Sequence, residues 1–473
     1  MGILRKPSGR QLAVPIASRV RWTAGSCAAR MRLLTRITTY SGQPASHPRA
    51  PCPCDNRHNV AAKRALNLRR VISPQDRHGR SMLAIQSSRT ETKMGHIESL
   101  DCLRGISALL VMCYHYRELL NDVIPNIGNT LFENGRIGVD AFFILSGFVM
   151  YATTQSKSNQ LVLPFLIKRA LRVIPLAWLF ITIVFIGTGG EDRHAFLLSL
   201  LFIPLSNTDA PFFGYNLLSP GWTLSYELWF YVMFAIGMLV SKSHRGLAAA
   251  TVLCACVFGL QALCHTPLYI DAYPAATFSA NLPIPAQLVS ELSNPLFFEF
   301  ILGVALAYLY ANFRASWLAM NEKIRIGAYL FLTAYFLSHF FSGYAMGHGL
   351  TRKGLAAVAL FSVYLCSDFD GLLGKTKAFI RGPGGAFIFL GRISFSLYIV
   401  HEPLHQFVAS IPVLSELYRL EGGIGKFVTL SAFSVVAAYA LFHLVEQPTQ
   451  RLGKYLADRT DVVVRALRQS ATV

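Results

Sequence analysis

The sequence predicts an all-α integral membrane protein, a bundle of about ten transmembrane helices whose N- and C-termini both lie in the cytoplasm. Hydrophobic residues make up 53% of the 473-residue chain, and its mean hydropathy is +0.41. Charged residues make up only 15%, whereas soluble domains carry about a quarter. Apolar segments of membrane-spanning length recur along the chain, and the basic residues between them concentrate on one side.

Ten apolar segments are near the length of about 20 residues that a bilayer requires. They run approximately over residues 101–120, 137–154, 168–188, 222–241, 246–264, 292–312, 326–343, 354–368, 387–409 and 425–446. The segment from His194 to Leu205 is too short to span, so we expect it to lie in the interface or to re-enter the membrane.

The basic residues predict the orientation of these spans. With the start of the first span in the cytoplasm, the connections and tail on that side carry 17 Lys and Arg, and the opposite connections carry seven. The long loop from His265 to Glu291 carries none. Because positive residues favour the cytoplasmic side, we expect both termini there, in a bacterial cytoplasmic membrane.

The net charge of +19 belongs mainly to an N-terminal extension, residues 1–93. Residues 1–90 hold 17 Lys and Arg against two acidic residues, and the rest of the chain holds 27 against 23. The charge therefore gives no reason to expect a nucleic-acid partner. The extension lacks the apolar core of a secretory signal, and we expect it to be disordered, or spurious if translation starts at Met94.

Residues 94–450 are then the transmembrane domain, and residues 451–473 are a short basic cytoplasmic tail. No soluble catalytic domain is expected after the last span, so the activity is expected to lie in the bundle. No paired CxxC motif or histidine-rich partner occurs among the nine cysteines. We therefore predict no metal site and interpret the cysteines as small buried residues.

The first span, LDCLRGISALLVMCYHY, carries two ionisable residues, Arg104 and His115. They are eleven positions apart, which places both on one helix face, separated by roughly 16 Å along the axis. Ionisable residues in spanning helices are costly and usually functional. The alternative is that Arg104 is an interfacial anchor and His115 a packing residue.

Three further residues are expected at the depth of His115: Asp140 in GRIGVDAFFILSG, Glu227 in SPGWTLSYELWFY and His401 in GRISFSLYIVHEP. A neutral histidine oriented by a carboxylate can take a proton from a hydroxyl near pH 7. The alternatives are structural: Asp140 pairs with Arg136 one turn away, Glu227 bonds a neighbouring helix, and His401 marks only a kink before a proline.

Four arginines form a second layer at the expected cytoplasmic face, namely Arg104, Arg169, Arg172 and Arg392. Arginine binds phosphate in bidentate fashion, so the cluster suits a phosphate-bearing ligand. Alternatively, Arg169 and Arg172 only anchor their helix at the membrane surface.

Aromatic residues near these two layers are candidates for binding a sugar or an acyl chain. Together with His401, the candidate substrate-binding residues are Trp222 and Tyr398. The simpler interpretation of Trp222 and its neighbours is that they are interfacial aromatics.

The segments that carry these residues resemble those of the acyltransferase-3 family, which includes bacterial polysaccharide O-acetyltransferases and macrolide acylases. The matching segments are LDCLRGISALLVMCYHY, GVDAFFILSGFVM, FLIKRALRVIP, WTLSYELWFY, FFEFILG and GRISFSLYIVHEP. They occur in family order and cover nearly all of residues 97–450. The resemblance places the family's arginine-x10-histidine signature on Arg104 and His115, and its RxxR element on Arg169 and Arg172. It likewise places the aspartate of the family's GVDxFF element on Asp140 and the glutamate of its WTLSxE element on Glu227.

The resemblance implies a ten-helix membrane O-acyltransferase with no permanently bound cofactor. Its donor would be cytoplasmic acyl-CoA, commonly acetyl-CoA, and His115 would act as general base or carry the acyl group. The expected acceptor is a hydroxyl of a cell-envelope saccharide or its lipid-linked precursor. This sequence departs from one branch of the family in having no C-terminal SGNH-type domain; if transfer onto a finished polymer needs one, a lipid-linked or smaller acceptor is favoured. A macrolide or other small hydroxylated molecule is the second candidate. From the residues alone, a proton-coupled transporter or an idle scaffold remains a rival.

Overall fold

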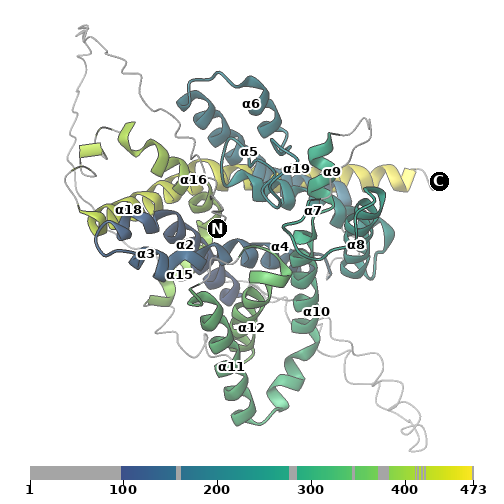
Figure 1. The fold of residues 1–473 in the computed structure, drawn as a ribbon. Coiled ribbons are helices and arrows are strands. Elements are labelled where there is room, and N and C mark those ends of the chain that lie inside the picture. The colour runs from purple at the N-terminus through teal and green to yellow at the C-terminus, as the bar shows by residue number, and fades with distance from the viewer. Residues whose placement is uncertain are drawn as a thin grey trace, which may run out of the picture. The chain divides into compact units, whose positions relative to one another are not determined.

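The computed structural model describes residues 97–155, 161–275, 285–343, 347–370, 383–410 and 422–470, together with residues 412, 415, 416 and 419. All of them belong to one compact unit, residues 89–473. They form helices and short connections, with no strand among them (Figure 1). The predicted extension over residues 1–93 lies outside the described residues.

The helices follow one another along the chain with these bounds. They are α2 (Glu98–Asn121), α3 (Ile127–Phe132), η2 (Glu133–Arg136), α4 (Ile137–Gln155), α5 (Val162–Gly187), α6 (Arg193–Leu200), α7 (Gly221–Val240), α8 (Arg245–Leu263), α9 (Ala286–Leu292), η3 (Pro295–Phe297), α10 (Phe298–Ala319), α11 (Glu322–Phe340), η4 (Leu350–Gly354), α12 (Leu355–Phe369), α15 (Pro383–Arg392), α16 (Ser394–Phe407), η5 (Val408–Ser410), α18 (Gly423–Leu441), η6 (Phe442–Glu446) and α19 (Gln447–Ser470).

Each of the ten predicted spans overlaps helix in the structure, and the all-α, multi-pass membrane character is confirmed. In the described part of the chain, seven helical segments are long and apolar enough to cross a membrane. Helix α2 is not among them and carries several ionisable residues. Helix α11, which holds the seventh predicted span, is not among them either. The same is true of the ninth predicted span, which is divided at Ile393 between α15 and α16. The count of ten and the cytoplasmic side of the termini remain predictions.

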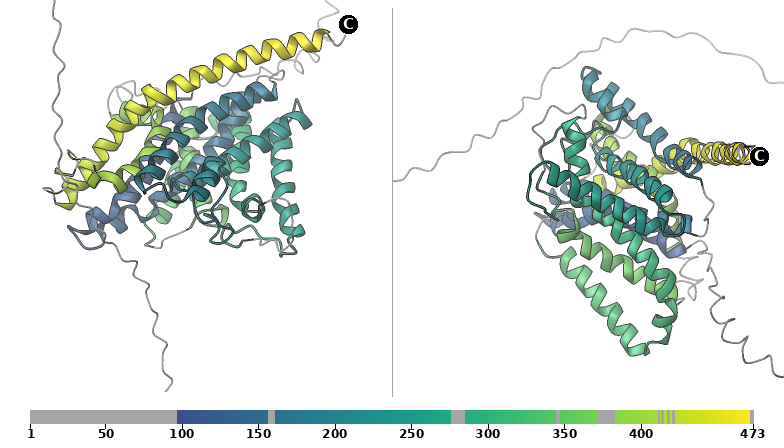
Figure 2. Two further views of the ribbon diagram at one scale, coloured as in Figure 1. Left: turned by 90° about the horizontal axis from the view of Figure 1, so that it is seen from above. Right: turned by 90° about the vertical axis from the view of Figure 1, so that its right-hand side faces the viewer.

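Residues 451–470 of the expected short tail are helical. Helix α19 continues from α18 through η6 as one long helix, drawn in yellow in Figure 2. It packs against α5, where Lys168 pairs with Asp458 at 3.3 Å. This contact couples the C-terminal helix to the helix that carries Arg169 and Arg172.

Helix α2 is a hub of the bundle, because α4, α12, α15, α16 and α18 all pack against it. Figure 1 shows α2 and α4 between α5 and α16 on one side and α10 and α12 on the other. This arrangement allows one helix to present ionisable side chains to several neighbours at once.

Close packing of α4 against α10 depends on glycine. A methyl group on Gly303 would overlap the backbone carbonyl oxygen of Ile144, and one on Gly147 would overlap that of Phe300. Small residues allow membrane helices to approach at backbone distance. The α4–α10 pair therefore has no room for a side chain at either glycine.

We predict that Gly303→Ala destabilises the protein, because α10 must move away from α4. The expected loss is about 1–3 kcal/mol, the usual cost of overpacking a core. The control is Gly327→Ala in α11, where the added methyl group would meet no atom within 4 Å. The midpoint temperature of thermal unfolding in detergent micelles is measured for both variants. Equal midpoint temperatures for the two would contradict the predicted packing.

Candidate functional site

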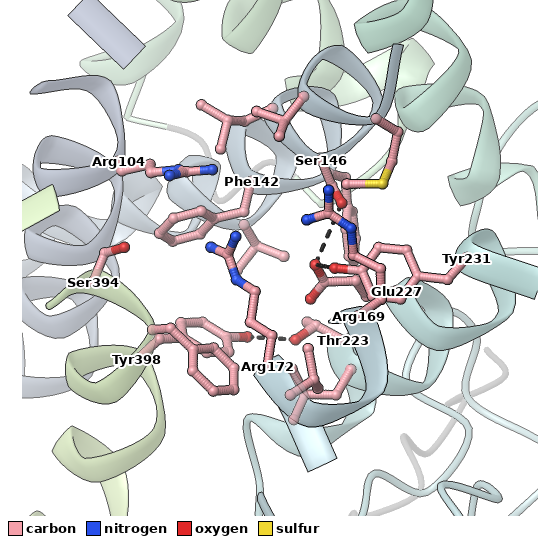
Figure 3. A pocket seen from close by; sticks show the side chains of 18 residues that line it. Arg104, Phe142, Ser146, Arg169, Arg172, Thr223, Glu227, Tyr231, Ser394 and Tyr398 are labelled. Carbon is pink, nitrogen blue, oxygen red and sulfur yellow. Dashed lines mark hydrogen bonds between the residues drawn. The ribbon is translucent and has the colours of Figure 1, made fainter. Parts of the chain in front are cut away.

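A cavity lies inside the bundle between α2, α4, α5, α7 and α16, and its space, including the part open to solvent, is about 730 Å³ (Figure 3). Half of the residues that line it are apolar. The polar and charged side chains that line it are Arg104, Ser146, Arg169, Arg172, Thr223, Glu227, Tyr231, Ser394 and Tyr398. Five of the ten residues singled out in the sequence thus meet at one cavity.

Three arginines dominate the charge of this cavity. Arg169 and Arg172 come from α5, where a spacing of three places both on one helix side, and Arg104 comes from α2. The charges of the two α5 arginines act directly on Arg104. Figure 3 shows the three guanidinium groups around the same space. The predicted grouping of these three side chains is therefore present in the structure.

The three guanidinium groups are only partly satisfied by the protein. Arg104 pairs with Asp101 at 3.7 Å, and Arg169 donates a long hydrogen bond of 3.4 Å to Thr153. The buried Nε of Arg169 has no partner among the described residues, and Arg172 hydrogen-bonds none of them. Unused donors on half-buried cations are suited to an anionic ligand.

Glu227 is the one acidic residue in the described lining of this cavity. Ser146 donates to its carboxylate at 3.3 Å, and the hydroxyl of Tyr231 donates to the same oxygen. Its charge also acts on Arg169. The described lining thus carries one carboxylate and three guanidinium groups, and the buried Glu446 outside the lining also interacts with Arg104 and Arg172.

Tyr398 connects the cavity to two histidines that do not line it. Its hydroxyl is 2.8 Å from that of Thr223, and its ring centroid lies 6.0 Å from that of His401. The ring of His401 in turn lies 5.0 Å from that of His115. The two imidazoles therefore lie directly behind one wall of the cavity.

His115 is not oriented by a carboxylate in this structure, contrary to the prediction. Its ring contacts those of Tyr114 and His401, and no described carboxylate hydrogen-bonds it. Glu227 is instead occupied by two hydroxyl groups, as described above, and Asp140 by a different histidine.

Asp140 is fully buried and holds His348. Its Oδ2 lies 2.9 Å from His348 Nδ1, and its Oδ1 accepts a 3.1 Å hydrogen bond from the backbone N–H of Gly349. The alternative partner, Arg136, pairs with Glu133 instead. Asp140 therefore joins α4 to the segment before η4 and does not line the cavity.

Sequence reasoning missed His348 and two buried residues close to this pair. Glu299 and Lys353 both act electrostatically on Asp140 and are buried. Their positions lie more than 150 residues after Asp140 in the sequence, and no shared motif connects them. Two signals were available: His348 stands between two glycines, which is typical of a turn, and Glu299 lies in FFEFILG, one of the family-like segments.

Two further predicted residues lie away from the cavity lining. The side chain of Arg392, the last residue of α15, is exposed and does not line the cavity, so its part in the arginine cluster stays a prediction. Trp222 is buried in an aromatic group with Phe143, Phe212 and His348, which fits packing better than contact with a ligand in this cavity. No group of three or more metal-ligating residues occurs in the described ranges.

Comparison with known proteins gives a family match over most of the chain. Residues 97–443 match the family model of the acyltransferase domain. The chain is 31% identical over 121 residues to the exopolysaccharide production protein ExoZ of Rhizobium meliloti, covering 24% of this chain and 38% of that protein. No solved structure matches.

Two other relatives match over longer stretches. The putative peptidoglycan O-acetyltransferase YrhL of Bacillus subtilis is 25% identical over 391 residues, covering 76% of this chain and 55% of YrhL. The acyltransferase MdmB of Streptomyces mycarofaciens is 24% identical over 394 residues, covering 75% of this chain and 92% of MdmB. The chain therefore spans about half of YrhL, and less of ExoZ.

Proposed function

Because the chain belongs to the acyltransferase-3 family, we propose that it transfers an acyl group, commonly acetyl, from cytoplasmic acyl-CoA to a hydroxyl group of a cell-envelope saccharide or its lipid-linked precursor. The observation that carries this proposal is the convergence of three arginines on one cavity inside the membrane domain. Acyl-CoA is a donor with phosphate groups at one end and a reactive thioester at the other.

The arginines bind the phosphate groups of the donor. A guanidinium group offers planar, paired N–H donors that match phosphate oxygens, and it stays charged when buried. The unused donors of Arg169 and Arg172 are available for this contact. The apolar half of the lining, which includes Phe142 and Val173, suits the uncharged arm of the donor.

The thioester end then lies toward Tyr398 and the two histidines. His115 takes the proton of the acceptor hydroxyl while the oxygen forms a bond to the thioester carbonyl carbon. The carbon–sulfur bond breaks, and the proton passes from His115 to the departing thiolate. A two-step route through an acyl-histidine gives the same net reaction.

A saccharide acceptor is supported by the relatives. ExoZ is named for exopolysaccharide production and YrhL for O-acetylation of peptidoglycan. The second candidate is a small hydroxylated molecule such as a macrolide. It is favoured by MdmB, an acyltransferase whose name mentions no polysaccharide and which this chain covers over 92% of its length.

We predict that Arg172→Ala raises the KM for acyl-CoA about ten- to hundredfold, because it removes charge-assisted hydrogen bonds to the donor. Its kcat and its KM for the acceptor should change little. Arg392→Ala is the matched control, since this arginine is exposed and outside the cavity lining. Steady-state kinetics with varied acyl-CoA measure both; an effect on the acceptor KM alone would contradict the donor assignment.

We predict that His115→Ala lowers kcat about 10²–10⁴-fold, the usual contribution of general-base catalysis. The amount of protein in the membrane should stay at the wild-type level, because the side chain makes no hydrogen bond to a described residue. Acyl transfer by the purified variant, normalised to folded protein, measures this loss. Wild-type turnover would remove His115 from the mechanism.

A further inference from the structure

We propose that His401 positions His115 for the reaction, by accepting a hydrogen bond from one ring nitrogen of His115 and leaving its other ring nitrogen free to act as base. The inference rests on the proposed function, because it requires His115 to be the base. It assigns to His401 the orienting role that the sequence suggested for a carboxylate, in place of substrate binding.

The tautomer of His401 is determined by its neighbour on α16. Its Nδ1 lies 3.0 Å from the backbone carbonyl oxygen of Leu397. A carbonyl oxygen only accepts hydrogen bonds, so Nδ1 must carry the hydrogen. In the neutral ring, Nε2 therefore has a free lone pair and can only accept.

This acceptor is buried and has no partner. His401 is 1% exposed, and no described residue hydrogen-bonds its Nε2. A buried polar atom without a partner costs about 1–3 kcal/mol, and such atoms are usually paired in native structures. We therefore expect Nε2 of His401 to have a hydrogen-bond partner in the working enzyme.

The ring of His115 is in the right place to be that partner. The two ring centroids are 5.0 Å apart, and the ring planes meet edge to face at 72°. An N–H···N hydrogen bond requires its two nitrogens to lie about 2.9 Å apart, which this separation allows after rotation of the His115 side chain.

His401 itself is held firmly. The hydroxyl of Tyr116 donates to its backbone carbonyl oxygen at 2.6 Å and is also 2.7 Å from the hydroxyl of Ser434. These contacts join α2, α16 and α18 directly beside the two imidazoles. A fixed acceptor can define the orientation of a neighbouring side chain that is less constrained.

The other charged or titratable groups around His115 do not offer such an acceptor. Arg117 and Arg136 act on it electrostatically, but guanidinium groups accept no hydrogen bond. His405 also acts on it, yet its ring contact is with Tyr116. The two candidate carboxylates are bonded elsewhere, as described above. His401 is thus the acceptor that the described residues place beside the base.

The proposed bond assists proton transfer. When His115 takes the acceptor proton it becomes an imidazolium ion, and its second N–H then donates to a lone pair on His401. This stabilises the positive charge until the proton passes to the departing thiolate. His401 neither gains nor loses a proton in this sequence.

Two substitutions distinguish the role of Nδ1 of His401 from that of Nε2. In His401→Asn, the amide N–H can replace Nδ1 in its bond to Leu397, but the acceptor is lost. In His401→Gln, the longer side chain places an amide oxygen near the position of Nε2. We expect kcat to fall about tenfold or more in the Asn variant and to stay within about threefold of wild type in the Gln variant.

The KM for acyl-CoA should be unchanged in both variants, since neither alters the arginines. The control is His443→Asn, the same replacement at an exposed histidine in η6, which should leave kcat unchanged. Equal losses of kcat in the Asn and Gln variants would overturn the proposal. An unchanged kcat in the Asn variant would also overturn it. So would a change in either variant that is confined to the KM for the acceptor.

If the His401→Asn variant does not fold, the kcat of the His401→Gln variant tests the acceptor role of His401 alone. A kcat near wild type in folded Gln protein supports the acceptor role, and a loss as deep as that of His115→Ala overturns it. Failure of the proposed function itself is recognised separately. It would appear as full turnover by His115→Ala, whatever the His401 variants do.

Discussion

Partial burial of three like charges inside an apolar helix bundle is the constraint on which the rest of this structure depends. Guanidinium groups are costly to remove from water and repel one another, so a cluster of them is tolerated only with compensating anions. The protein supplies Glu227 inside the cavity, Asp101 beside Arg104, and the buried Glu446, which interacts electrostatically with Arg104 and Arg172. The arginine cluster is the feature behind the proposed donor with several phosphate groups. Helix α2, which carries Arg104, packs against five other long helices.

Helix α16 connects this charged cavity to the proposed chemistry. It contributes Tyr398 to the cavity wall and, three residues later, His401 to the contact with His115. Residues three apart lie on one helix face, so the two ends of the proposed reaction path are joined by one turn of helix. Helix α2 makes the same connection over a longer distance, with Arg104 at the cavity and His115 beside α16. Both helices must keep their relative position for the donor site and the base to act together.

Much of the fold and part of the site could be predicted from the sequence. Hydrophobic length predicted the helices, and helical spacing with the family resemblance predicted the grouping of Arg104, Arg169 and Arg172. The hydrogen bond of Asp140 to His348 could not be predicted, because 208 positions separate the two residues and nothing in either segment indicates the other. The position of Arg392 outside the cavity lining could not be predicted, because its segment was taken as one continuous span. In the structure that segment breaks at Ile393, and Arg392 is exposed.

The most direct test of the central claim is the binding of radiolabelled acetyl-CoA to the purified full-length protein, in competition with unlabelled coenzyme A and with pantetheine, which has the same thiol arm but no phosphate. If the buried arginines hold the phosphate groups, coenzyme A will displace the label at far lower concentration than pantetheine, and Arg172→Ala will narrow that difference. Equal displacement by the two competitors would contradict the account.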